Sequence, residues 1–418
     1  MTNDTTQAQQ DLALMEPDSA FGSVRSRPFA RGGERLTAKD ILARARVAVP
    51  LLREQGVEIE CARHLPPAVV DILRQTGVFR MAMPRAWDGP EMDPMQQTEV
   101  IEELATGDAS AAWCAMIGCD SGFYSGYLDE ERAREMFPRL DMVTAGWLAP
   151  EGKAERVSGG FTISGRWRFA SGCTHSDWMV AGCIVHSGGV PEPSTGPLPV
   201  HWRIMLARPE QFRIEDTWFT TGLAGSGSCD YVATELFIPE SHSFLFSEPR
   251  RPGPLYQAPD AVLRKMAGVP LGVARAALDH VRGIAPHRVE RQSKTPWPES
   301  YRVQVAIAEA ALELSAARHA VYASLEAQWD RLTKGESPLP DERAAVVLAR
   351  FGAFRAARAV VTRLYDLVGG SAIYRERSPM DRLLRDITTM SQHVEAQETT
   401  LQACGQLLLG QRPGHPFI

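Results

Sequence analysis

The spacing of apolar residues changes twice along the chain. The first part repeats apolar residues at helical steps, the middle part alternates them with polar residues as strands do, and the last part returns to helical steps. We therefore expect a mostly α-helical protein with a central antiparallel β domain. The predicted divisions are a flexible N-terminal tail over residues 1–35, a helical domain over 36–140, a β-barrel domain over 141–247 and a C-terminal four-helix bundle over 248–418.

The middle part carries the strand signals. Gly, Pro and Ser clusters separate its alternating runs, Ser158-Gly159-Gly160 has the chemistry of a hairpin turn, and the four prolines within residues 188–199 exclude a central strand there. Since no helical run interrupts these strands, we expect an antiparallel sheet or a small barrel. The expected strands are Met142–Trp147, Phe161–Ala170, Trp178–Val185, Trp202–Ala207 and Tyr231–Ile238.

The last part predicts a bundle of long amphipathic helices. Its apolar residues fall on one face of each helix, as in the Val360, Leu364 and Leu367 set, and Ser378-Pro379 is typical of a helix start. Four such helices suggest an antiparallel arrangement. The expected helices are Val262–Val281, Tyr301–Arg331, Asp341–Val368 and Ser378–Leu409.

Composition narrows the class of protein. The chain has 418 residues, of which 44% are hydrophobic and 23% charged, and its net charge of -6 gives no basic footprint for nucleic acid or anionic lipid. The polar first ~35 residues lack the apolar segment of a signal peptide, and no run reaches the ~20 apolar residues of a membrane span. The 7 cysteines show no paired spacing, so neither a zinc site nor a disulfide framework is expected, and a reducing cytoplasm fits best.

Two motifs carry the candidate chemistry. Gly369-Gly370-Ser371 closes an apolar helix and is followed by Arg385-Asp386 and then by His393. In the β domain, the strand that contains Phe169 ends in Ser171 and Gly172, small residues that let a flat ligand approach the backbone. Each motif alone has a simpler interpretation, as a helix end or as a strand followed by a turn.

Taken in order, these motifs resemble the acyl-CoA dehydrogenase superfamily, in which the Gly-Gly turn and the following Arg-Asp close over a flavin. The dehydrogenases proper carry a glutamate base where this chain has His393-Val394. A histidine in this segment is similar to the flavin-dependent two-component monooxygenases of the same fold, a group that includes p-hydroxyphenylacetate hydroxylases, steroid-phenol hydroxylases, dibenzothiophene monooxygenases and indole oxidases.

The resemblance implies an oxygenase component. Reduced FMN or FADH2 would diffuse from a separate NAD(P)H-dependent flavin reductase, which is a transient partner, O2 would add to form a flavin hydroperoxide, and oxygen would pass to a small phenol- or indole-like aromatic substrate. The chain has no GxGxxG nicotinamide fingerprint at a strand-to-helix junction, which agrees with reduction of the flavin by a separate protein. The resemblance also implies a homotetramer in which neighbouring subunits share the flavin.

The same resemblance assigns candidate site residues. His393 and Ser171 are the candidate catalytic residues, because an imidazole changes charge near neutral pH and can take a proton from a phenol or hydrogen-bond the distal oxygen of the hydroperoxide. The candidate cofactor-binding residues are Phe169, Ser171, Arg288, Arg291, Ser293, Gly369, Gly370 and Ser371. The candidate substrate-binding residues are Trp113, Asp120, Arg264, Met266 and His393.

Several alternatives remain open at this point. His393 could be a core histidine, and the two arginines after the first bundle helix could be a solvated face. An acyl-CoA dehydrogenase remains possible if a one-residue gap brings Glu395 to the base position, and so does a helical scaffold without a catalytic site. Several related monooxygenases carry a histidine soon after an Ala-Trp pair, whereas here Asp120 falls near that place.

Overall fold

The computed structural model describes residues 35–194, 198–257 and 260–418. The tail expected over residues 1–35 therefore lies, except for Arg35, outside the described residues. Within the described residues six helices precede the sheet, and four of them begin at side-chain caps provided by Thr37, Asp93, Asp108 and Asp129. Their bounds are α1 (Ala38–Ala62), α2 (Pro67–Thr76), α3 (Pro94–Ala105), α4 (Ala109–Gly118), α5 (Ser121–Ser125) and α6 (Glu130–Met136).

The central sheet confirms the five expected strands and adds three short ones. The hairpin between β1 and β2 turns at Ser158-Gly159, where Gly159 has a φ of 80°. The strands are β1 (Thr144–Val157), β2 (Gly160–Ala170), β3 (Trp178–Ser187), β4 (Val190–Pro191), β5 (Trp202–Ala207), β6 (Arg213–Glu215), β7 (Cys229–Pro239) and β8 (Ser243–Phe244).

The sheet is mixed, and this corrects one detail of the antiparallel prediction. Its strand order is β6-β7-β2-β1-β3-β5-β8, and β1 pairs parallel with β3 while the other pairs are antiparallel. The reason is that β2 and β3 run in opposite directions on the two sides of β1. Within the described residues this order runs from one edge strand to the other, so these pairs do not close a barrel.

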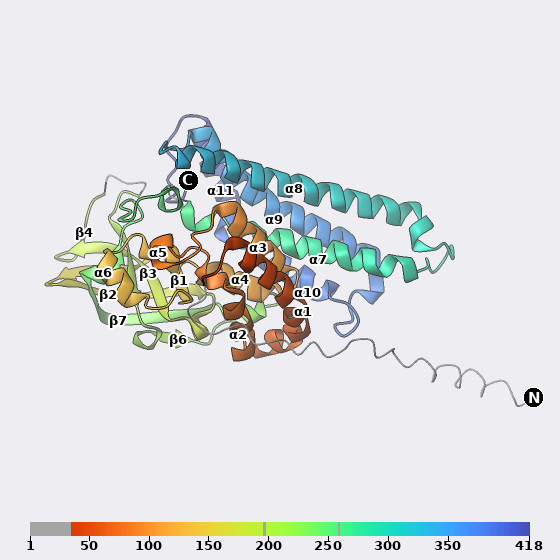
Figure 1. Cartoon of the computed structure of the whole chain (residues 1–418), viewed down its shortest axis with the longest axis horizontal. Helices are drawn as coiled ribbons and strands as arrows, with labels where there is room; N and C mark the ends of the chain where they lie inside the picture. The colour runs from red at the N-terminus through yellow and green to blue at the C-terminus, as the bar shows by residue number, and fades with distance from the viewer. Residues whose placement is uncertain (1–34, 195–197, 258–259) are drawn as a thin grey trace, which may run out of the picture. The chain divides into compact units, whose positions relative to one another are not determined.

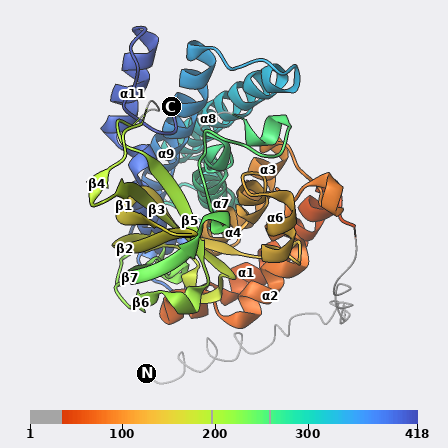
Figure 2. The ribbon, with the colours of Figure 1, turned by 90° about the vertical axis from the view of Figure 1, so that its left-hand side faces the viewer.

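Long helices form the last part of the chain. They are α7 (Gly268–Ile284), α8 (Tyr301–Thr333), α9 (Pro340–Val368), α10 (Met380–Met390) and α11 (Glu398–Leu408). The sheet lies at one end of α7, α8 and α9 (Figure 1), and α3 and α4 pack against α7. Figure 2 shows α4 between the strands and the long helices. Among the described helices, none combines the length and apolar character needed to cross a bilayer.

The prediction of one continuous helix over Ser378–Leu409 was wrong. The helix stops at Met390, and residues 391–397 form a turn with a short 3₁₀ segment, η12 (Val394–Ala396), before α11 begins. The Ser391 hydroxyl donates to the Ile387 carbonyl, and the Gln397 side chain donates to the Ser391 carbonyl. The second of these bonds satisfies a carbonyl that an unbroken helix would have paired internally. His393 therefore lies in a turn and not on a helix face.

Candidate active site

Four elements bring aromatic and polar side chains together beside the sheet. The His393 ring lies 5.6 Å from the Trp113 ring of α4 and 6.3 Å from the Trp147 ring of β1, both edge-on. The Trp113 indole N–H donates to Ser171 Oγ at 3.1 Å. Phe169, two residues before Ser171, packs its ring 5.6 Å from Trp147. The structure thus brings four of the expected site residues together with Trp147.

The composition of α4 explains how Trp113 reaches the sheet. Apart from the tryptophan, the buried residues around it are mainly alanine, serine, cysteine and glycine, so the helix packs closely against neighbouring backbone. Asp108 caps its first turn by accepting from the Ala111 N–H. Trp113 is then the largest side chain of a helix made mainly of small residues, and its indole N–H reaches Ser171 at the end of β2.

A row of hydroxyls continues from Trp113 into the glycine-rich turn over residues 221–228. Ser171 Oγ lies 2.7 Å from Ser228 Oγ, which lies 2.8 Å from Ser226 Oγ, and the Ser226 hydroxyl donates to the Leu223 carbonyl. A carbonyl can only accept and an indole N–H can only donate. The chain therefore runs one way, from Trp113 through Ser171, Ser228 and Ser226, and Ser171 keeps one lone pair but no free hydrogen. We call these three residues the serine chain.

Helix α10 holds the glycine-rich turn in place. Asp386 accepts from the Leu223 N–H at 2.6 Å, and Arg385 donates to the Thr221 carbonyl. A side chain at Gly222 would collide with the Arg385 carbonyl, since a Cβ would lie 2.1 Å from that oxygen. Burial raises the pKa of Asp386 to about 7, with Asp108 adding to the effect. The Arg-Asp motif thus acts on the turn that carries two of the three serines.

Phe169 presents a flat apolar surface next to Ser171. Its backbone has a φ of 62°, a left-handed conformation that is uncommon for an aromatic residue, and 46% of the residue is exposed. Trp218 packs edge-on against the other side of the ring. A strained residue with an exposed ring is typical of a ligand-binding position.

His393 is held as a neutral imidazole of one tautomer. Its Nδ1 accepts from the Glu395 backbone N–H at 3.2 Å, so the ring hydrogen resides on Nε2. Burial lowers the pKa of His393 to about 4, and Arg350 lowers it further, while Glu395 opposes them. At neutral pH the side chain is therefore a hydrogen-bond donor through Nε2, between two indole rings.

A buried ion pair anchors the turn that carries His393. Arg350 of α9 donates to Glu395 Oε2 at 2.6 Å, and each side chain is only 2% exposed. His415 lies 3.7 Å from the other carboxylate oxygen. Burial acts to raise the pKa of Glu395, but Arg350 and the two histidines outweigh it, so the pKa is lowered and the carboxylate stays charged. Glu395 therefore faces α9 and the C-terminal residues.

The phosphate-side candidates lie at the other end of α9. Arg288 donates to the Val368 carbonyl and stacks on Trp297, beside the exposed Gly369, Gly370 and Ser371. Arg291 and Ser293 are exposed, and Ser293 donates to Glu290. Arg350 and Val368 are 18 residues apart on one helix, which is about 27 Å at 1.5 Å per residue. One chain therefore does not bring these residues to Ser171 and His393.

The substrate-side candidates are divided. Asp120 follows α4, about 10 Å along its axis from Trp113, and forms a buried ion pair with Lys265, whose ammonium also donates to the Val262 carbonyl. Burial raises the pKa of Asp120 to about 6 against the effect of Lys265. Arg264 binds Asp260 and two carbonyls of the preceding loop, and Met266 is a core residue.

The sequence analysis missed Ser226, Ser228, Lys265 and Arg350. The sequence did contain signals for the two serines and for Arg350. The Ser-Gly-Ser sequence of the glycine-rich turn offered hydroxyls, and Arg350 falls among Val346, Val347, Ala353 and Phe354 on the apolar face of its helix, where a charge requires a buried partner.

The residues present suit a flavin ring. An exposed aromatic surface at Phe169, the free lone pair of Ser171 and the imidazole N–H surround the same position. Close by, both ring nitrogens of His175 are buried without a hydrogen-bond partner, and this imidazole lies against Gly172. Unpaired buried polar atoms next to a strand end are expected where a polar ligand completes the site.

Comparison with known families identifies both helical parts of the chain. The model described as "Acyl-CoA dehydrogenase, N-terminal domain" matches residues 45–140. The model described as "Acyl-CoA dehydrogenase, C-terminal domain" matches residues 265–398, which include the turn that carries His393.

Individual relatives share most of their length with this chain. Indole-3-acetate monooxygenase of Pseudomonas putida is 32% identical over 360 residues, covering 85% of this chain and 90% of the relative. The FADH(2)-dependent resorcinol hydroxylase oxygenase component of Rhizobium sp. (strain MTP-10005) is 26% identical, and the match covers 89% of this chain and 95% of the relative. The crystal structure of 3-HSA hydroxylase from Rhodococcus sp. RHA1 matches the fold with a TM-score of 0.82 at 24% identity, covering 91% and 99%.

The Arg350–Glu395 pair generates a stability prediction. Replacing Glu395 with Gln keeps the shape but leaves Arg350 buried without its counter-charge, so we expect the free energy of unfolding at pH 7 to fall by about 3–5 kcal/mol. The wild-type protein should lose this contribution as the pH falls below the ordinary glutamate value of 4.5, because the folded-state pKa is lowered. Urea denaturation at pH 7 and pH 4 measures both effects.

The exposed neighbour Glu398 provides the control. Glu398→Gln should change stability little at either pH. If Glu395→Gln were as stable as the Glu398 variant at pH 7, the ion pair would not hold the turn.

Proposed function

The chain belongs to the acyl-CoA dehydrogenase family and, within it, to the flavin-dependent monooxygenases, and we propose that Trp113, Ser171 and His393 form the centre at which it oxygenates an aromatic small molecule. The protein is the oxygenase component of a two-component system, and a separate flavin reductase supplies its reduced flavin. The observation that carries the proposal is the neutral His393 imidazole, held beside Trp113 with Nε2–H free.

Ser171 binds the flavin ring by accepting a hydrogen bond. Reduced flavin, when bound, would activate O2 so that one of its two oxygen atoms can be transferred. The central ring of reduced flavin carries an N–H at a position where oxidised flavin has only a lone pair. Because the Ser171 hydroxyl donates its hydrogen to Ser228, it can only accept from the flavin, and it therefore favours the reduced ring. Phe169 packs against the ring, and the serine chain thereby selects the form that reacts with oxygen.

His393 acts as a hydrogen-bond donor. Its Nδ1 is occupied by the Glu395 N–H, and its pKa of about 4 keeps it neutral. The imidazole therefore donates Nε2–H toward the oxygen to be transferred or toward the substrate, and exclusion of water by Trp113 and Trp147 strengthens this bond. Of the two roles considered from the sequence, donation fits this tautomer better than removal of a substrate proton.

The substrate class is a phenol- or indole-like ring. The two most relevant relatives are named for indole-3-acetate and resorcinol, both flat aromatic molecules with polar groups. In this chain Trp113 and Trp147 provide aromatic surface, and the buried Asp120–Lys265 pair lies just beyond the C-terminal end of α4, the helix that carries Trp113. That pair is a candidate partner for a polar substituent of the ring.

The dehydrogenase alternative needs a carboxylate base that faces the site. Glu395 would have to supply it, yet its carboxylate is buried against Arg350 and charged. A base committed to an ion pair on the far side of the turn is poorly placed to remove a proton from a substrate beside Trp113. This geometry and the monooxygenase relatives both favour oxygenation.

A homotetramer would complete the flavin site. The ring-side group is Phe169, Ser171 and His393, and the phosphate-side group is Arg288 with the Gly369–Ser371 turn. On α9, Arg350, which binds the turn that carries His393, lies about 27 Å from Val368, whose carbonyl accepts from Arg288, so a partner's phosphate-side group is the one available to the ring side. Three grooves along the bundle offer surfaces for a second copy of the chain.

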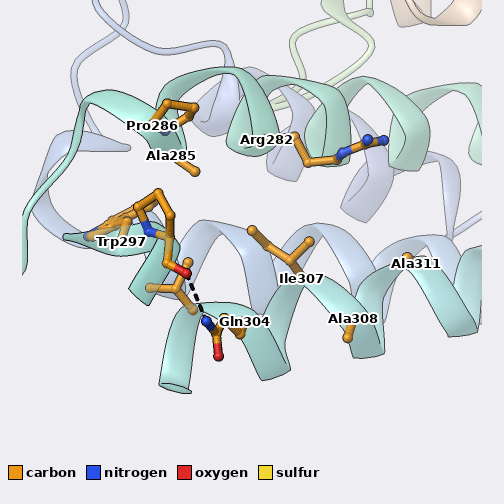
Figure 3. Close-up of a pocket in the computed structure, with 10 residues that line it drawn as sticks. Arg282, Ala285, Pro286, Trp297, Gln304, Ile307, Ala308 and Ala311 are labelled. Carbon is orange, nitrogen blue, oxygen red and sulfur yellow. Dashed lines mark hydrogen bonds between the residues drawn. The ribbon is translucent and has the colours of Figure 1, made fainter. Parts of the chain in front are cut away.

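These grooves follow the long helices. One of 650 Å³ lies between the end of α7 and the start of α8, lined by Ala285, Trp297 and Ile307, and Figure 3 shows these side chains facing one another across it. A groove of 530 Å³ between α8 and α9 is mostly alanine, and a third of 1020 Å³ follows α9. The Arg288 guanidinium stacks on the Trp297 ring, so the first groove borders the phosphate-side group.

The principal test is His393→Ala. Loss of the Nε2–H donor should reduce product formation on the order of 10²–10³-fold, while reduced flavin still binds and consumes oxygen, so that hydrogen peroxide replaces product. Product, peroxide and melting temperature are measured together. His319→Ala, on the exposed face of α8, is the control and should remain coupled. A His393→Ala enzyme that hydroxylates at the wild-type rate would falsify the assignment.

The direction of the hydrogen bonds in the serine chain is tested at Ser226. This residue does not bond to Ser171 directly, because Ser228 lies between them. Ser226→Ala takes away the acceptor for Ser228, so the hydroxyls can reverse. We expect the preference for reduced over oxidised flavin, measured as a ratio of dissociation constants, to fall about 2- to 10-fold, as one hydrogen bond of about 0.5–1.5 kcal/mol allows. Ser125→Ala, a buried serine outside the chain, should leave the ratio unchanged.

Subunit sharing is tested by mixing inactive copies. His393→Ala and Arg288→Ala chains, co-expressed with different tags and purified together, should regain about a quarter of wild-type activity, because random mixing in a closed tetramer pairs one intact ring side with one intact phosphate side at a quarter of the sites. Co-expression of two His393→Ala chains is the control. A monomer in light scattering that binds flavin with wild-type affinity would exclude shared sites.

A further inference from the structure

The residues after α11 form neither a helix nor a strand, yet their start is well defined. Gly410 has a φ of 74°, its N–H donates to the Leu407 carbonyl at 3.0 Å, and the Gln411 N–H donates to the Gln406 carbonyl at 2.8 Å. This is the Schellman ending of a helix, in which a glycine in the left-handed conformation redirects the chain. We call residues 411–418 the strap, and both ribbon views show the end of the chain beside α11 (Figure 1, Figure 2).

The far end of the strap is buried. Ile418 is 4% exposed and belongs to an apolar cluster with residues of α9 and α11. The Phe417 ring packs 5.6 Å from the Trp202 ring of β5 and 5.9 Å from the Phe246 ring. Burial of large apolar side chains is the main force that can hold a segment without regular structure. The strap is therefore seated at a defined position, in contact with both the sheet and the bundle.

Between these anchors, His415 faces the ion pair that holds the His393 turn. Its Nδ1 accepts from the Phe417 backbone N–H at 3.3 Å, and burial lowers the pKa of His415 below its ordinary value of 6.5, so at pH 7 the ring hydrogen is on Nε2. This Nε2 lies 3.7 Å from Glu395 Oε1, whereas Arg350 contacts the other oxygen, Oε2, at 2.6 Å. An N–H dipole at this distance is attracted to a carboxylate that is only 2% exposed. The strap thus restrains the second oxygen of Glu395.

The strap also contacts the wall that carries Trp147. Trp202, on which the phenyl ring of the strap packs, donates its indole N–H to the Leu148 carbonyl at 2.8 Å. Leu148 directly follows Trp147, whose ring lies 6.3 Å from that of His393. One short segment therefore reaches both rings, through Trp202 and Leu148 on one side and through Glu395 on the other.

We propose that the strap is a positioning element for oxygen transfer, and that His415 is a positioning residue that keeps the His393 turn at a fixed distance from Trp147. His415 acts through Glu395, whose backbone N–H fixes the His393 tautomer, and not by contact with the reacting atoms. The consequence for catalysis rests on the proposed function, whereas the hold of the strap on the turn does not.

A loosened strap changes the fate of oxygen more than the binding of flavin. The proposed flavin contact Ser171 is held by Trp113 and the serine chain, whereas His393 depends on Glu395. A displaced Nε2–H no longer meets the oxygen to be transferred. O2 then takes two electrons and two protons from reduced flavin and leaves as hydrogen peroxide, and the substrate stays unchanged.

The first test measures the hold on the turn in full-length protein without flavin. Hydrogen exchange is followed in peptides that cover residues 391–397. His415→Ala and Phe417→Ala should exchange these amides about 2- to 10-fold faster than the wild type, as the loss of one weak contact allows. His415→Gln keeps a side-chain N–H donor and should exchange as the wild type does. Arg412→Ala, which changes an exposed residue of the strap, is the control.

The second test measures coupling in the same variants with reduced FMN or FADH2 and O2. Indole-3-acetate and resorcinol, for which two relatives are named, serve as probes. His415→Ala and Phe417→Ala should lower the share of oxygen recovered in product by about 2- to 10-fold and raise peroxide by the matching amount. The Kd for reduced flavin should stay the same, and His415→Gln should recover the coupling.

Three results would overturn the proposal. The first is exchange at residues 391–397 that is no faster in His415→Ala than in Arg412→Ala. The second is faster exchange with unchanged coupling. The third is a loss of product that is matched by an equal loss of reduced-flavin affinity and is not recovered by His415→Gln, because the strap would then be a purely structural element. If exchange responds as expected but the wild type oxygenates neither probe, the hold on the turn stands and the proposed function fails.

Discussion

The buried ion pair between Arg350 and Glu395 is the interaction on which the site depends. The same residue, Glu395, holds His393 twice, because its carboxylate fastens the turn to α9 and its backbone N–H fixes the imidazole tautomer. A buried pair contributes little net stability when complete, yet it is costly to break. The turn over residues 391–397 therefore has one strongly favoured arrangement, and Nε2–H points in one direction.

Apolar periodicity was sufficient to predict the order of domains, the five main strands and the long helices, since burial of one face determines these elements. It could not predict the break after Met390. The sequence from Ser378 to Leu409 favours a helix throughout, and the turn exists because Arg350, about 45 positions earlier, requires a carboxylate at Glu395. The parallel pairing of β1 with β3 is likewise decided by which side of β1 each neighbour takes.

The candidate site shows the same limit. Ser171, Phe169, Trp113 and His393 were predicted mainly from the resemblance to the flavin-dependent monooxygenases, and only the strand end at Phe169 and Ser171 had a local signal, the small residues that let a ligand approach the backbone. Their partners Ser226, Ser228 and Lys265 come from distant segments, and hydrogen bonds between such segments leave no period in a sequence. The phosphate-side residues were also predicted, but a single chain holds them apart from Ser171, so their roles stay predictions that depend on a second copy.

The fixed direction of the serine chain affects which form of flavin, reduced or oxidised, occupies the site in a cell. An acceptor-only Ser171 has no hydrogen to offer the oxidised ring, which lacks the matching N–H. With Ser171 in the role we propose, abundant oxidised flavin would compete weakly, although it has nearly the same shape. Occupancy of the site would follow the ratio of reduced to oxidised flavin more than the total amount, so that oxygenation rises and falls with the supply of reducing equivalents.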